Sequence, residues 1–559
     1  MQRYSRHTIA LVILAALLTI AVSLPRSDSR DFRIARNLDI FISLIRELNT
    51  FYVDEFDPDK LITSVIRSTL NTLDPYTVYY PEEDSDDIAF MTTGQYGGIG
   101  AMIREDGDLA VVTRVYKDFP AHKAGVRAGD RLKKIDDKSL KNYGASAISD
   151  LLKGEPGSEI EITVERLGRD TLFQIRRERV ALKAVPYYGM LDDGVTGYIR
   201  FTNFTRNCAG DVRGAVKSLI ENDNAEQIIL DVRGNPGGLL NEATEIVNIF
   251  VDPGNEVVST RGRNEQFDAV HKTKNKALDT DIPLAVLISS GSASAAEIVA
   301  GAIQDLDRGV VIGQRSFGKG LVQITRPLSY NAQLKVTTAK YYIPSGRCIQ
   351  ALDYSDRRED GSVGNIPDSL ISEFTTRNGR IVKDGGGIMP DIEIEPPLIG
   401  RLATKLYVQQ YLFNFATRFY HDNPDIESIA QLTAREDIFE ELIAYLAENE
   451  FSYTTSTEAA LDNLIDAARQ ESYYDMHHET FSRLRETLSS DKATDMELAR
   501  EDIIRLLLSD LAGRYLYEEG EIRMMISDDA VIEEARTALS DRERYTTILS
   551  PATGSTSIQ

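Results

Sequence analysis

Cysteine, histidine and basic residues are all scarce in this 559-residue chain, and each scarcity removes a class of structure or function. The two cysteines, Cys208 and Cys348, exclude a disulfide framework and leave room for one bridge at most. They do not form a Cys-x-x-Cys pair, so we expect two buried thiols. Lys and Arg number 63 against 87 Asp and Glu, a formal net charge of -24. Because such a field repels phosphates, the charge argues against nucleic acid and favours protein or peptide partners.

The shortage of histidine argues against a Ser-His-Asp catalytic site. None of the six histidines stands in a segment that resembles a catalytic loop. Two of them are adjacent, and adjacent positions on a helix point in different directions, so a solvated surface is expected there rather than a metal site. The six are His7, His122, His271, His421 and the adjacent pair His477 and His478.

The first 24 residues have the layout of a targeting segment. Arg3 and Arg6 precede an uncharged stretch, 8–24, which is typical of a secretory signal or a short membrane anchor. Ala21-Val22-Ser23 fits a signal-peptidase site, yet the apolar run is almost long enough to span a bilayer, so cleaved and anchored forms both stay open. The sequence therefore predicts an exported, periplasmic protein, either soluble or held at the inner membrane by residues 1–24.

The rest of the chain changes character several times, as expected for a protein of this length with several cores. Residues 31–90 carry apolar residues at helical spacing, with two helices between Asn37 and Leu73. Region 91–180 is rich in short β-like runs. Region 181–400 alternates strands with helices, and 401–549 is helical and acidic. The last residues, 550–559, are predicted to be disordered.

Region 181–400 is predicted to be an α/β core with substantially parallel strands, because its apolar runs alternate with helical patterns. The predicted strands are 197–201, 227–232, 284–289, 310–313 and 335–341, and the predicted helices are 210–221, 239–250 and 295–306.

Region 91–180 resembles a PDZ domain of the bacterial type. A glycine loop, Gly97 to Ile103, feeds a strand, and Ala-x-x-Ala-Gly-x-x-x-Gly-Asp follows at 121–130. In PDZ domains such a loop offers backbone N–H groups to a terminal carboxylate while the peptide adds as a strand. The alternative is a tight turn that merely requires glycine. The candidate peptide-binding residues are Gly98, Ile99, Gly100 and Ala101.

Ser294 is a candidate nucleophile. It follows an apolar run and a series of tiny residues, and a helix is predicted immediately after it. Ser294-x-x-Glu297 also has the form of a helix capping box, but the two roles are compatible. A helix N-terminus presents free N–H groups, which favour negative charge developing nearby.

Lys319 is the candidate base. The segment from Gly313 to Lys319 matches most of a phosphate-binding P-loop, but Gly320 stands where that motif needs Ser or Thr, and a β-prone run follows. A lysine accepts a serine proton only when neutral, and burial lowers its pKa. The apolar neighbours Phe317, Leu321 and Val322 offer that burial, whereas an exposed turn lysine is the alternative.

Two backbone amides are candidates for stabilising the oxyanion of the tetrahedral intermediate. One belongs to Ala295, directly after the nucleophile. A second can come from the glycine turn 231–239, which ends a strand and starts a helix, although ordinary turn chemistry explains the same pattern.

Together these segments resemble the carboxy-terminal processing, or tail-specific, protease family over residues 35 to 398. That resemblance implies a crotonase-like core, with Ser294 as nucleophile, Lys319 as general base and Gln323 orienting the lysine. It also implies an oxyanion hole of Gly237 and Ala295, with Gly238 as the alternative to Gly237, and a PDZ module that captures substrate C-termini and gates the site. The motifs are 73–77, the PDZ-like module, 231–238, 291–298, 317–323 and 342–347.

The sequence departs from the family pattern in three segments. Tyr76-Thr77 stands where the family more often has His-Ser, Cys348 where it often has Ser, and Lys153 where arginine is common. If the Lys153 side chain transmits occupancy of the PDZ module to the catalytic core, this coupling is expected to be weaker here than with arginine.

We therefore expect an exported serine endopeptidase that cleaves proteins near their C-termini, without a metal, nucleotide or other cofactor. Two alternatives remain open: a non-catalytic PDZ scaffold with a dead protease core, and a serine-lysine hydrolase of non-peptide amides. The helices after Arg401 lie outside the resemblance. They can serve to form a homo-oligomer or to bind an adaptor protein, and the sequence leaves both roles open.

Overall fold

The computed structural model describes residues 30–358, 360–395, 398–488 and 492–551, and it divides into two compact units, 1–72 and 73–559. The predicted targeting segment, 1–24, and most of the predicted disordered tail lie outside the described residues. Among the described helices, none is long and apolar enough to cross a membrane.

The first unit contains the two helices predicted between Asn37 and Leu73, α2 (Arg30–Phe51) and α3 (Pro58–Asn71). The start of α3 follows from its sequence. The Asp57 carboxylate accepts hydrogen bonds from the amides of Asp59 and Lys60, and Pro58 occupies the first turn, where no amide is needed.

The second unit is organised around a six-stranded sheet whose order is β10-β11-β12-β15-β16-β23. Only the β10–β11 pair is antiparallel, and the other neighbours run parallel. The predicted strands and helices of this region are confirmed to within two residues at each end. The strands are β10 (Tyr187–Met190), β11 (Thr196–Arg200), β12 (Gln227–Asp231), β15 (Leu284–Ile288), β16 (Val310–Gly313) and β23 (Ile392–Glu393).

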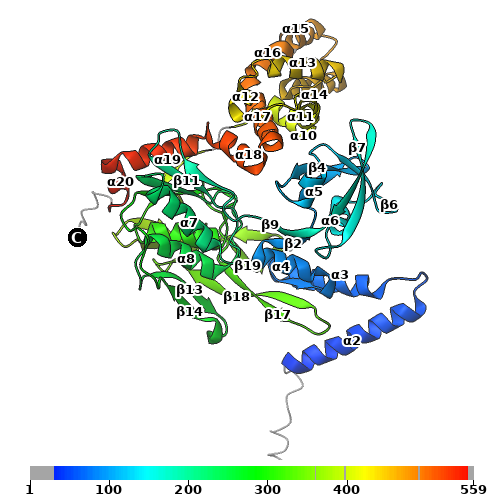
Figure 1. Cartoon of the computed structure of the whole chain (residues 1–559). Helices are drawn as coiled ribbons and strands as arrows, with labels where there is room; N and C mark the ends of the chain where they lie inside the picture. Colours follow the sequence, from blue (N-terminus) through cyan, green and yellow to red (C-terminus); the bar gives the residue numbers. More distant parts are fainter. Residues whose placement is uncertain (1–29, 359, 396–397, 489–491, 552–559) are drawn as a thin grey trace, which may run out of the picture. The chain divides into compact units, whose positions relative to one another are not determined.

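Both faces of this sheet are covered, which explains why β12 and β15 are buried along their whole length. One face packs against α7 (Cys208–Glu221), α8 (Leu240–Phe250) and α9 (Ala295–Asp305). The other face packs against α19 (Ala530–Ser540), almost at the end of the chain (Figure 1). The last helices after Arg401 therefore belong to the core of the α/β sheet, although their sequence reads as part of a separate helical region.

A second sheet is antiparallel and supports the loop that carries Lys319. Its long central strand is β18, which pairs with β1, β13 and β17, while β14 pairs with β13. The strands are β1 (Val78–Tyr80), β13 (Glu256–Gly262), β14 (Ala269–Lys272), β17 (Leu321–Pro327) and β18 (Gln333–Tyr342). Two small hairpins follow, β19 (Leu352–Arg357) with β20 (Val363–Asn365), and β21 (Glu373–Thr375) with β22 (Ile381–Lys383).

The PDZ-like module is a sheet of order β3-β4-β5-β7-β8 with its own core of buried aliphatic residues. β2 (Gln95–Gly98) and β9 (Glu178–Ala181) pair where the chain enters and leaves the module, after the short helix α4 (Ser85–Thr93). The remaining elements are β3 (Ala101–Asp106), β4 (Leu109–Val115), α5 (Pro120–Ala124), β5 (Arg131–Ile135), β6 (Lys138–Ser139), α6 (Ala145–Leu152), β7 (Glu159–Arg166) and β8 (Arg169–Arg176).

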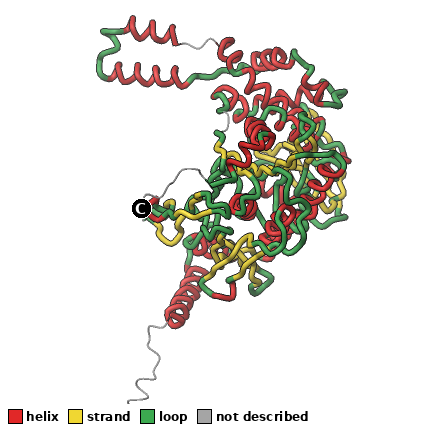
Figure 2. The backbone as a smooth tube through the Cα atoms, turned by 90° about the vertical axis from the view of Figure 1, so that its left-hand side faces the viewer, coloured by secondary structure: helices red, strands yellow, loops and turns green. Residues whose placement is uncertain are grey.

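The region after Arg401 is helical as predicted, and thirteen of the buried residues in its hydrophobic core come from α11, α13 and α17. Figure 2 shows this part as helices joined by loops, with α14 and α15 side by side. His477 and His478 are both exposed, as predicted for a solvated surface. The helices are α10 (Arg401–Val408), α11 (Tyr411–Asp422), α12 (Ile429–Thr433), α13 (Ile438–Glu448), α14 (Ser456–Gln470), α15 (His478–Leu488), α16 (Lys492–Leu498), α17 (Arg500–Tyr515), α18 (Tyr517–Ile526), α19 and α20 (Arg542–Ile548).

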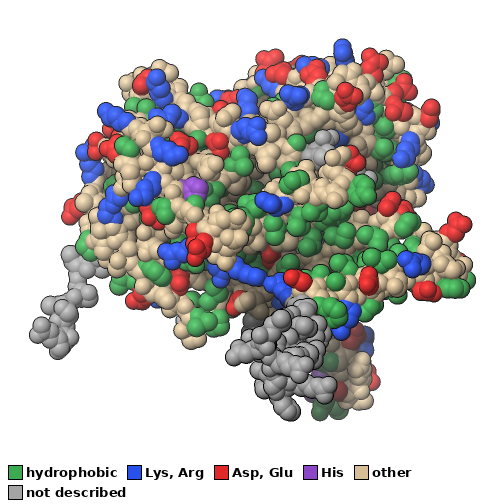
Figure 3. All heavy atoms as spheres, turned by 90° about the horizontal axis from the view of Figure 1, so that it is seen from below, with side chains coloured by type: hydrophobic (Ala, Val, Ile, Leu, Met, Phe, Trp, Pro, Cys, Tyr) green, Lys and Arg blue, Asp and Glu red, His purple; other side chains and the backbone are tan. Residues whose placement is uncertain are grey.

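Both cysteines are free thiols, as predicted. Cys208 is buried as expected, whereas Cys348 is only partly buried. On the face drawn in Figure 3, acidic and basic side chains are interspersed despite the net charge of -24.

Candidate active site

The candidate nucleophile, base and glycine turn meet because they follow neighbouring parallel strands. The glycine turn follows β12, Ser294 follows β15 and Lys319 follows β16, and these strands are adjacent in the sheet. The carboxyl ends of parallel strands lie at one edge, so the three loops leave the sheet at the same place. The two nearest loops are also joined directly, since the Ala293 amide donates to the Asn235 carbonyl at 2.9 Å.

Ser294 occupies a strained turn at the N-terminus of α9. Its φ is 55° and its ψ is −115°, a combination that a residue with a side chain rarely adopts. The turn is tight, because a Cβ added to Gly237 would lie 2.8 Å from Ser294 Cβ and 2.6 Å from the Ala293 carbonyl oxygen. A sharp strand-to-helix turn of this kind exposes the serine hydroxyl beside free helix N–H groups, as a nucleophile requires.

Glu297 joins the main chains of both candidate catalytic residues. Its fully buried carboxylate accepts hydrogen bonds from the amides of Ser294 (2.8 Å) and Lys319 (2.9 Å). It also accepts from the Ser316 hydroxyl (2.6 Å) and the Gly318 amide (2.7 Å). Burial raises the pKa of Glu297 to about 7, although these four donors favour the ionised form. Glu297 is thus more than the helix cap that the sequence predicts.

Tyr341 makes the complementary contact from β18. Its hydroxyl lies 2.6 Å from the Lys319 carbonyl oxygen and 3.2 Å from that of Ser294, and the side chain is buried. Glu297 therefore binds the amides of Ser294 and Lys319, while Tyr341 donates to their carbonyl groups. The relative position of the two residues is fixed through their backbones.

Lys319 has the electrostatic environment of a base. Burial lowers its pKa to about 8, and the nearby Lys335 acts in the same direction, whereas Glu297 and Asp74 raise the pKa. Leu321 is buried as expected, but Phe317 is 48% exposed. No hydrogen bond joins the Lys319 amine to the Ser294 hydroxyl in the described part of the chain. The amine lies over the Tyr76 ring, 4.1 Å from its centroid.

Gln323 lies on β17 near this loop, but its side chain is directed elsewhere. Its amide nitrogen donates to the Thr337 hydroxyl at 3.3 Å. The Thr337 amide in turn donates to the hydroxyl of Thr77, which is bonded to the Asp74 carboxylate. Among the described residues, Gln323 makes no hydrogen bond to Lys319, so its expected orienting role stays a prediction.

In the glycine turn, the N–H of one glycine is hydrogen-bonded within the protein and that of the next is not. The Gly237 amide donates to the Asn235 side-chain oxygen at 2.9 Å. Gly238 is exposed, and its amide donates to no acceptor among the described residues. The Ala295 amide has no acceptor among them either, although Ala295 is buried. In this conformation Gly238, the alternative considered above, is therefore better placed than Gly237 to act together with Ala295.

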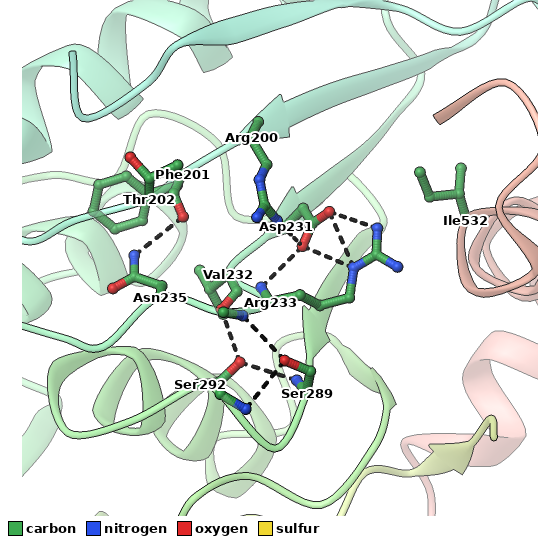
Figure 4. Close-up of polar contacts among 12 residues, drawn as sticks. Arg200, Phe201, Thr202, Asp231, Val232, Arg233, Asn235, Ser289, Ser292 and Ile532 are labelled. Carbon is green, nitrogen blue, oxygen red and sulfur yellow. Dashed lines mark hydrogen bonds and ion pairs between the residues drawn. The ribbon is translucent and has the colours of Figure 1, made fainter. Parts of the chain in front are cut away.

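A buried ion cluster fixes the start of the glycine turn (Figure 4). Asp231, at the end of β12, is 0% exposed and pairs with Arg233 (2.7 Å) and Arg200 (3.0 Å). Burial raises its pKa, but the two cations outweigh burial and hold the pKa at about 2. The carboxylate is therefore ionised at neutral pH.

Two of the four peptide-binding residues predicted in the PDZ-like module line a groove of about 530 Å³, and the other two flank these residues in the chain. Ile99 and Ala101 lie on its wall, Gly98 ends β2, and Gly100 turns the chain with a φ of 76°. β3 is an edge strand of its sheet and α6 forms the other wall, so an added strand can pair with β3.

Three residues of this site were not identified from the sequence. Glu297 was recognised only as a helix cap, and Tyr341 only as part of a strand. Tyr76 was noted only as a departure from the family pattern. The partners of Tyr341 are 22 and 47 residues away along the chain, so no local pattern could have assigned its role.

Comparisons with known proteins agree with this organisation. Residues 195–355 match peptidase family S41, residues 111–166 a PDZ domain, and residues 402–539 the C-terminal helical domain of a probable PDZ-protease. A carboxy-terminal-processing protease of Bartonella bacilliformis is 38% identical over 345 residues, covering 60% of this chain and 78% of that protein. A probable CtpA-like serine protease of Staphylococcus aureus is 34% identical over 316 residues, or 56% of this chain and 62% of that protein.

Among solved structures, the photosystem II D1 C-terminal processing protease is 26% identical. The match covers 64% of this chain and 87% of that one, with a TM-score of 0.35.

Proposed function

We propose, from the premise that this chain belongs to peptidase family S41 as a serine-type carboxy-terminal-processing protease, that it cleaves peptide bonds with a Ser294–Lys319 dyad. The observation that carries the proposal is the shared backbone attachment of these two residues. Glu297 and Tyr341 join a strained serine at a helix N-terminus to a lysine whose pKa is lowered to about 8.

In the proposed mechanism, neutral Lys319 takes the proton of the Ser294 hydroxyl, and the alkoxide oxygen attacks the scissile carbonyl carbon. The oxyanion that forms accepts hydrogen bonds from the amides of Ala295 and Gly238. Lys319 then donates its proton to the leaving amine, which departs as the C–N bond breaks. The neutral lysine next takes a proton from water, whose oxygen attacks the acyl carbon. The ester C–O bond to Ser294 then breaks, and the lysine returns the proton to the serine oxygen.

The Lys319 amine must move for this reaction, because it lies over the Tyr76 ring and not against the serine hydroxyl. A lysine side chain reaches such alternatives by rotating its χ angles, on a timescale far shorter than turnover. The arrangement is thus that of a resting site, in which substrate entry or loss of the proton releases the amine toward Ser294.

The PDZ module is proposed to bind substrate C-termini and to gate the site. Its groove lies between the free edge of β3 and α6, and apolar side chains line it, which fits an apolar C-terminus added as a strand. Lys153 also lines the groove, as expected if it senses occupancy. Export to the periplasm, with the protein soluble or anchored through residues 1–24, is part of the same proposal and rests on the N-terminal sequence alone.

Cleavage of an unfolded protein with an apolar C-terminus tests the dyad. We expect wild type to cleave it and to release fragments from near the C-terminus, and we expect Ser294→Ala and Lys319→Ala to be inactive. Lys340→Ala is the matched control, since it removes an exposed lysine of β18 that is not among the charges that shift the pKa of Lys319. Equal cleavage by wild type and both dyad variants would contradict the mechanism, and an inactive wild type would favour the alternative of a PDZ scaffold with a dead core.

A further inference from the structure

We propose that Asp529, in the C-terminal helical region, is a positioning residue of the active site that holds the glycine turn through Arg233. The inference rests on the proposed function, because it assigns to that turn the donor of the oxyanion hole. Its consequence is that the helical region after Arg401 completes the catalytic site, a role that its sequence does not indicate.

Arg233 is the link between the two parts of the chain. One edge of its guanidinium binds the buried Asp231 carboxylate, with Nη2 at 2.7 Å and Nε at 3.0 Å and 3.1 Å from its oxygens (Figure 4). Its Nη1 lies 2.7 Å from the Asp529 carboxylate. Arg233 and Asp529 are each only 20% exposed at the side chain, so solvent screens this ion pair weakly.

The charges of this cluster balance only when Asp529 is included. Asp231 is paired with two cations, Arg200 and Arg233, and Asp529 supplies the second negative charge. A planar guanidinium held on both sides by carboxylates has one orientation, since its donors form a rigid fork. Without Asp529, one side of the fork loses its partner and Arg233 can rotate.

The position of Arg233 matters for catalysis because the turn begins at this residue. The Arg233 amide donates to Asp231, and the next amide, that of Gly234, donates to the Ser289 hydroxyl at 3.0 Å. Four residues further along lies Gly238, whose amide is available to an oxyanion. Small displacements of such a donor have large effects on rate, because it must lie about 3 Å from the oxyanion.

Asp529 is itself held firmly by the fold. It is the N-cap of α19, where its carboxylate accepts from the amides of Val531 (2.9 Å) and Ile532 (3.2 Å). Ile532 is 1% exposed and packs against the catalytic sheet. The helix that covers the sheet thus also delivers the carboxylate to Arg233.

The test compares Asp529→Asn with Arg536→Gln in the full chain. Asn caps a helix as well as Asp does, so Asp529→Asn removes the charge but keeps the cap. Arg536 lies on the same helix, is 22% exposed and pairs with Asp193. That pair joins α19 to the turn before β11, at the opposite end of the strands from the glycine turn.

Kinetics on a peptide with an apolar C-terminus, together with inhibition by a peptide boronic acid, give the readout. For Asp529→Asn we expect kcat to fall at least fivefold, KM to stay within twofold, and boronate binding to weaken by the same factor as kcat, because a boronate adduct of serine uses the oxyanion hole. For Arg536→Gln we expect kcat within twofold of wild type. Asp529→Ser, which also keeps a cap, should behave as Asp529→Asn does.

A double-mutant cycle tests the path through Arg233. If Asp529 acts only through that side chain, Asp529→Asn should lower kcat by less than twofold further in an Arg233→Gln background. Full additivity, or a kcat for Asp529→Asn equal to that of Arg536→Gln, would overturn the inference while Ser294→Ala remains inactive. Activity that Ser294→Ala does not abolish would overturn the proposed function and the inference with it.

Discussion

The amine of Lys319 lies 4.1 Å from the centroid of the Tyr76 ring. An aromatic face attracts an ammonium, so this contact favours the protonated lysine. Burial and Lys335 act in the opposite direction and bring the pKa of Lys319 to about 8. Lys319 therefore has two accessible protonation states near its pKa. The charged amine lies over the ring, and the neutral amine can take a proton from Ser294.

The first prediction concerns the pH dependence of catalysis. Because only neutral Lys319 accepts the serine proton, kcat/KM should rise tenfold per pH unit below the pKa and level off above about pH 8. Below about pH 7 the protonation of Glu297 should steepen the loss, since the carboxylate then has one lone pair fewer for its four donors. A pH–rate profile of peptide cleavage provides the measurement. A flat profile between pH 6.5 and 9 would contradict the assignment of Lys319 as base.

The second prediction separates the ring of Tyr76 from its hydroxyl group. Tyr76→Leu removes the aromatic face, so the charged lysine loses stabilisation and the acidic limb of the pH–rate profile should move to lower pH. The expected shift is about half a pH unit if the ring contact contributes ~0.7 kcal/mol. Tyr76→Phe keeps the face and should leave the limb in place, although it loses the contact with the Tyr354 hydroxyl. Identical profiles for the Leu and Phe variants would show that the ring does not influence the base.

Much of this fold could be predicted from the sequence, because its strands and helices carry strong local patterns. The strands around Ile229 and Val286 are continuous apolar runs, and Ser294 and Lys319 stand in glycine-rich loops that follow such runs. What could not be predicted depends on distant contacts. The acidic helix after Asp529 has an ordinary amphipathic pattern, and nothing local in it indicates that it covers the catalytic sheet.

The same reason explains two details of the site that the sequence does not reveal. Gly237 carries the family motif, but its amide is already bound by a side chain two residues before it, which only the folded turn reveals. Tyr341 carries no signal at all, because its hydroxyl contacts main-chain atoms and any aromatic residue would fit the strand pattern.

The third prediction concerns Tyr341. Tyr341→Phe leaves the buried carbonyl group of Lys319 without its donor, so the free energy of unfolding should fall by about 1–3 kcal/mol. The loop then loses an anchor, and kcat should fall about tenfold with KM little changed. Tyr342→Phe is the control, since the neighbouring hydroxyl makes no hydrogen bond among the described residues. Equal kcat values for the two variants would rule out a positioning role for Tyr341.

The fourth prediction concerns the buried pair of Arg347 and Asp305, the last residue of α9. Both side chains are at most 1% exposed, and they lie 2.8 Å apart. Asp305→Asn would leave an unpaired buried cation, so chemical denaturation should give a free energy of unfolding lower by about 3–5 kcal/mol. The exposed Glu519, paired with Arg523, is the control, and Glu519→Gln should change stability by less than ~0.5 kcal/mol. A loss below ~1 kcal/mol for Asp305→Asn would contradict the structural role.

The fifth prediction concerns the PDZ groove. Ser146 on α6 is exposed and lines the groove, whereas its neighbour Ala147 is exposed but does not. Ser146→Trp should fill the groove and raise KM for a protein with an apolar C-terminus at least fivefold, while Ala147→Trp should leave KM within twofold. Fluorescence anisotropy of a labelled C-terminal peptide gives the same comparison without catalysis. Equal binding by both variants would place the peptide elsewhere.

The dyad is tested most directly by measuring which side chain a serine-reactive fluorophosphonate labels and how fast. We expect a single adduct on Ser294, seen by mass spectrometry of its peptide, that forms faster as the pH rises through about 8 in wild type. In Lys319→Met the adduct should form at least a hundredfold more slowly at every pH. An adduct on another residue, or labelling of Lys319→Met at the wild-type rate, would contradict the assignment of Ser294 and Lys319.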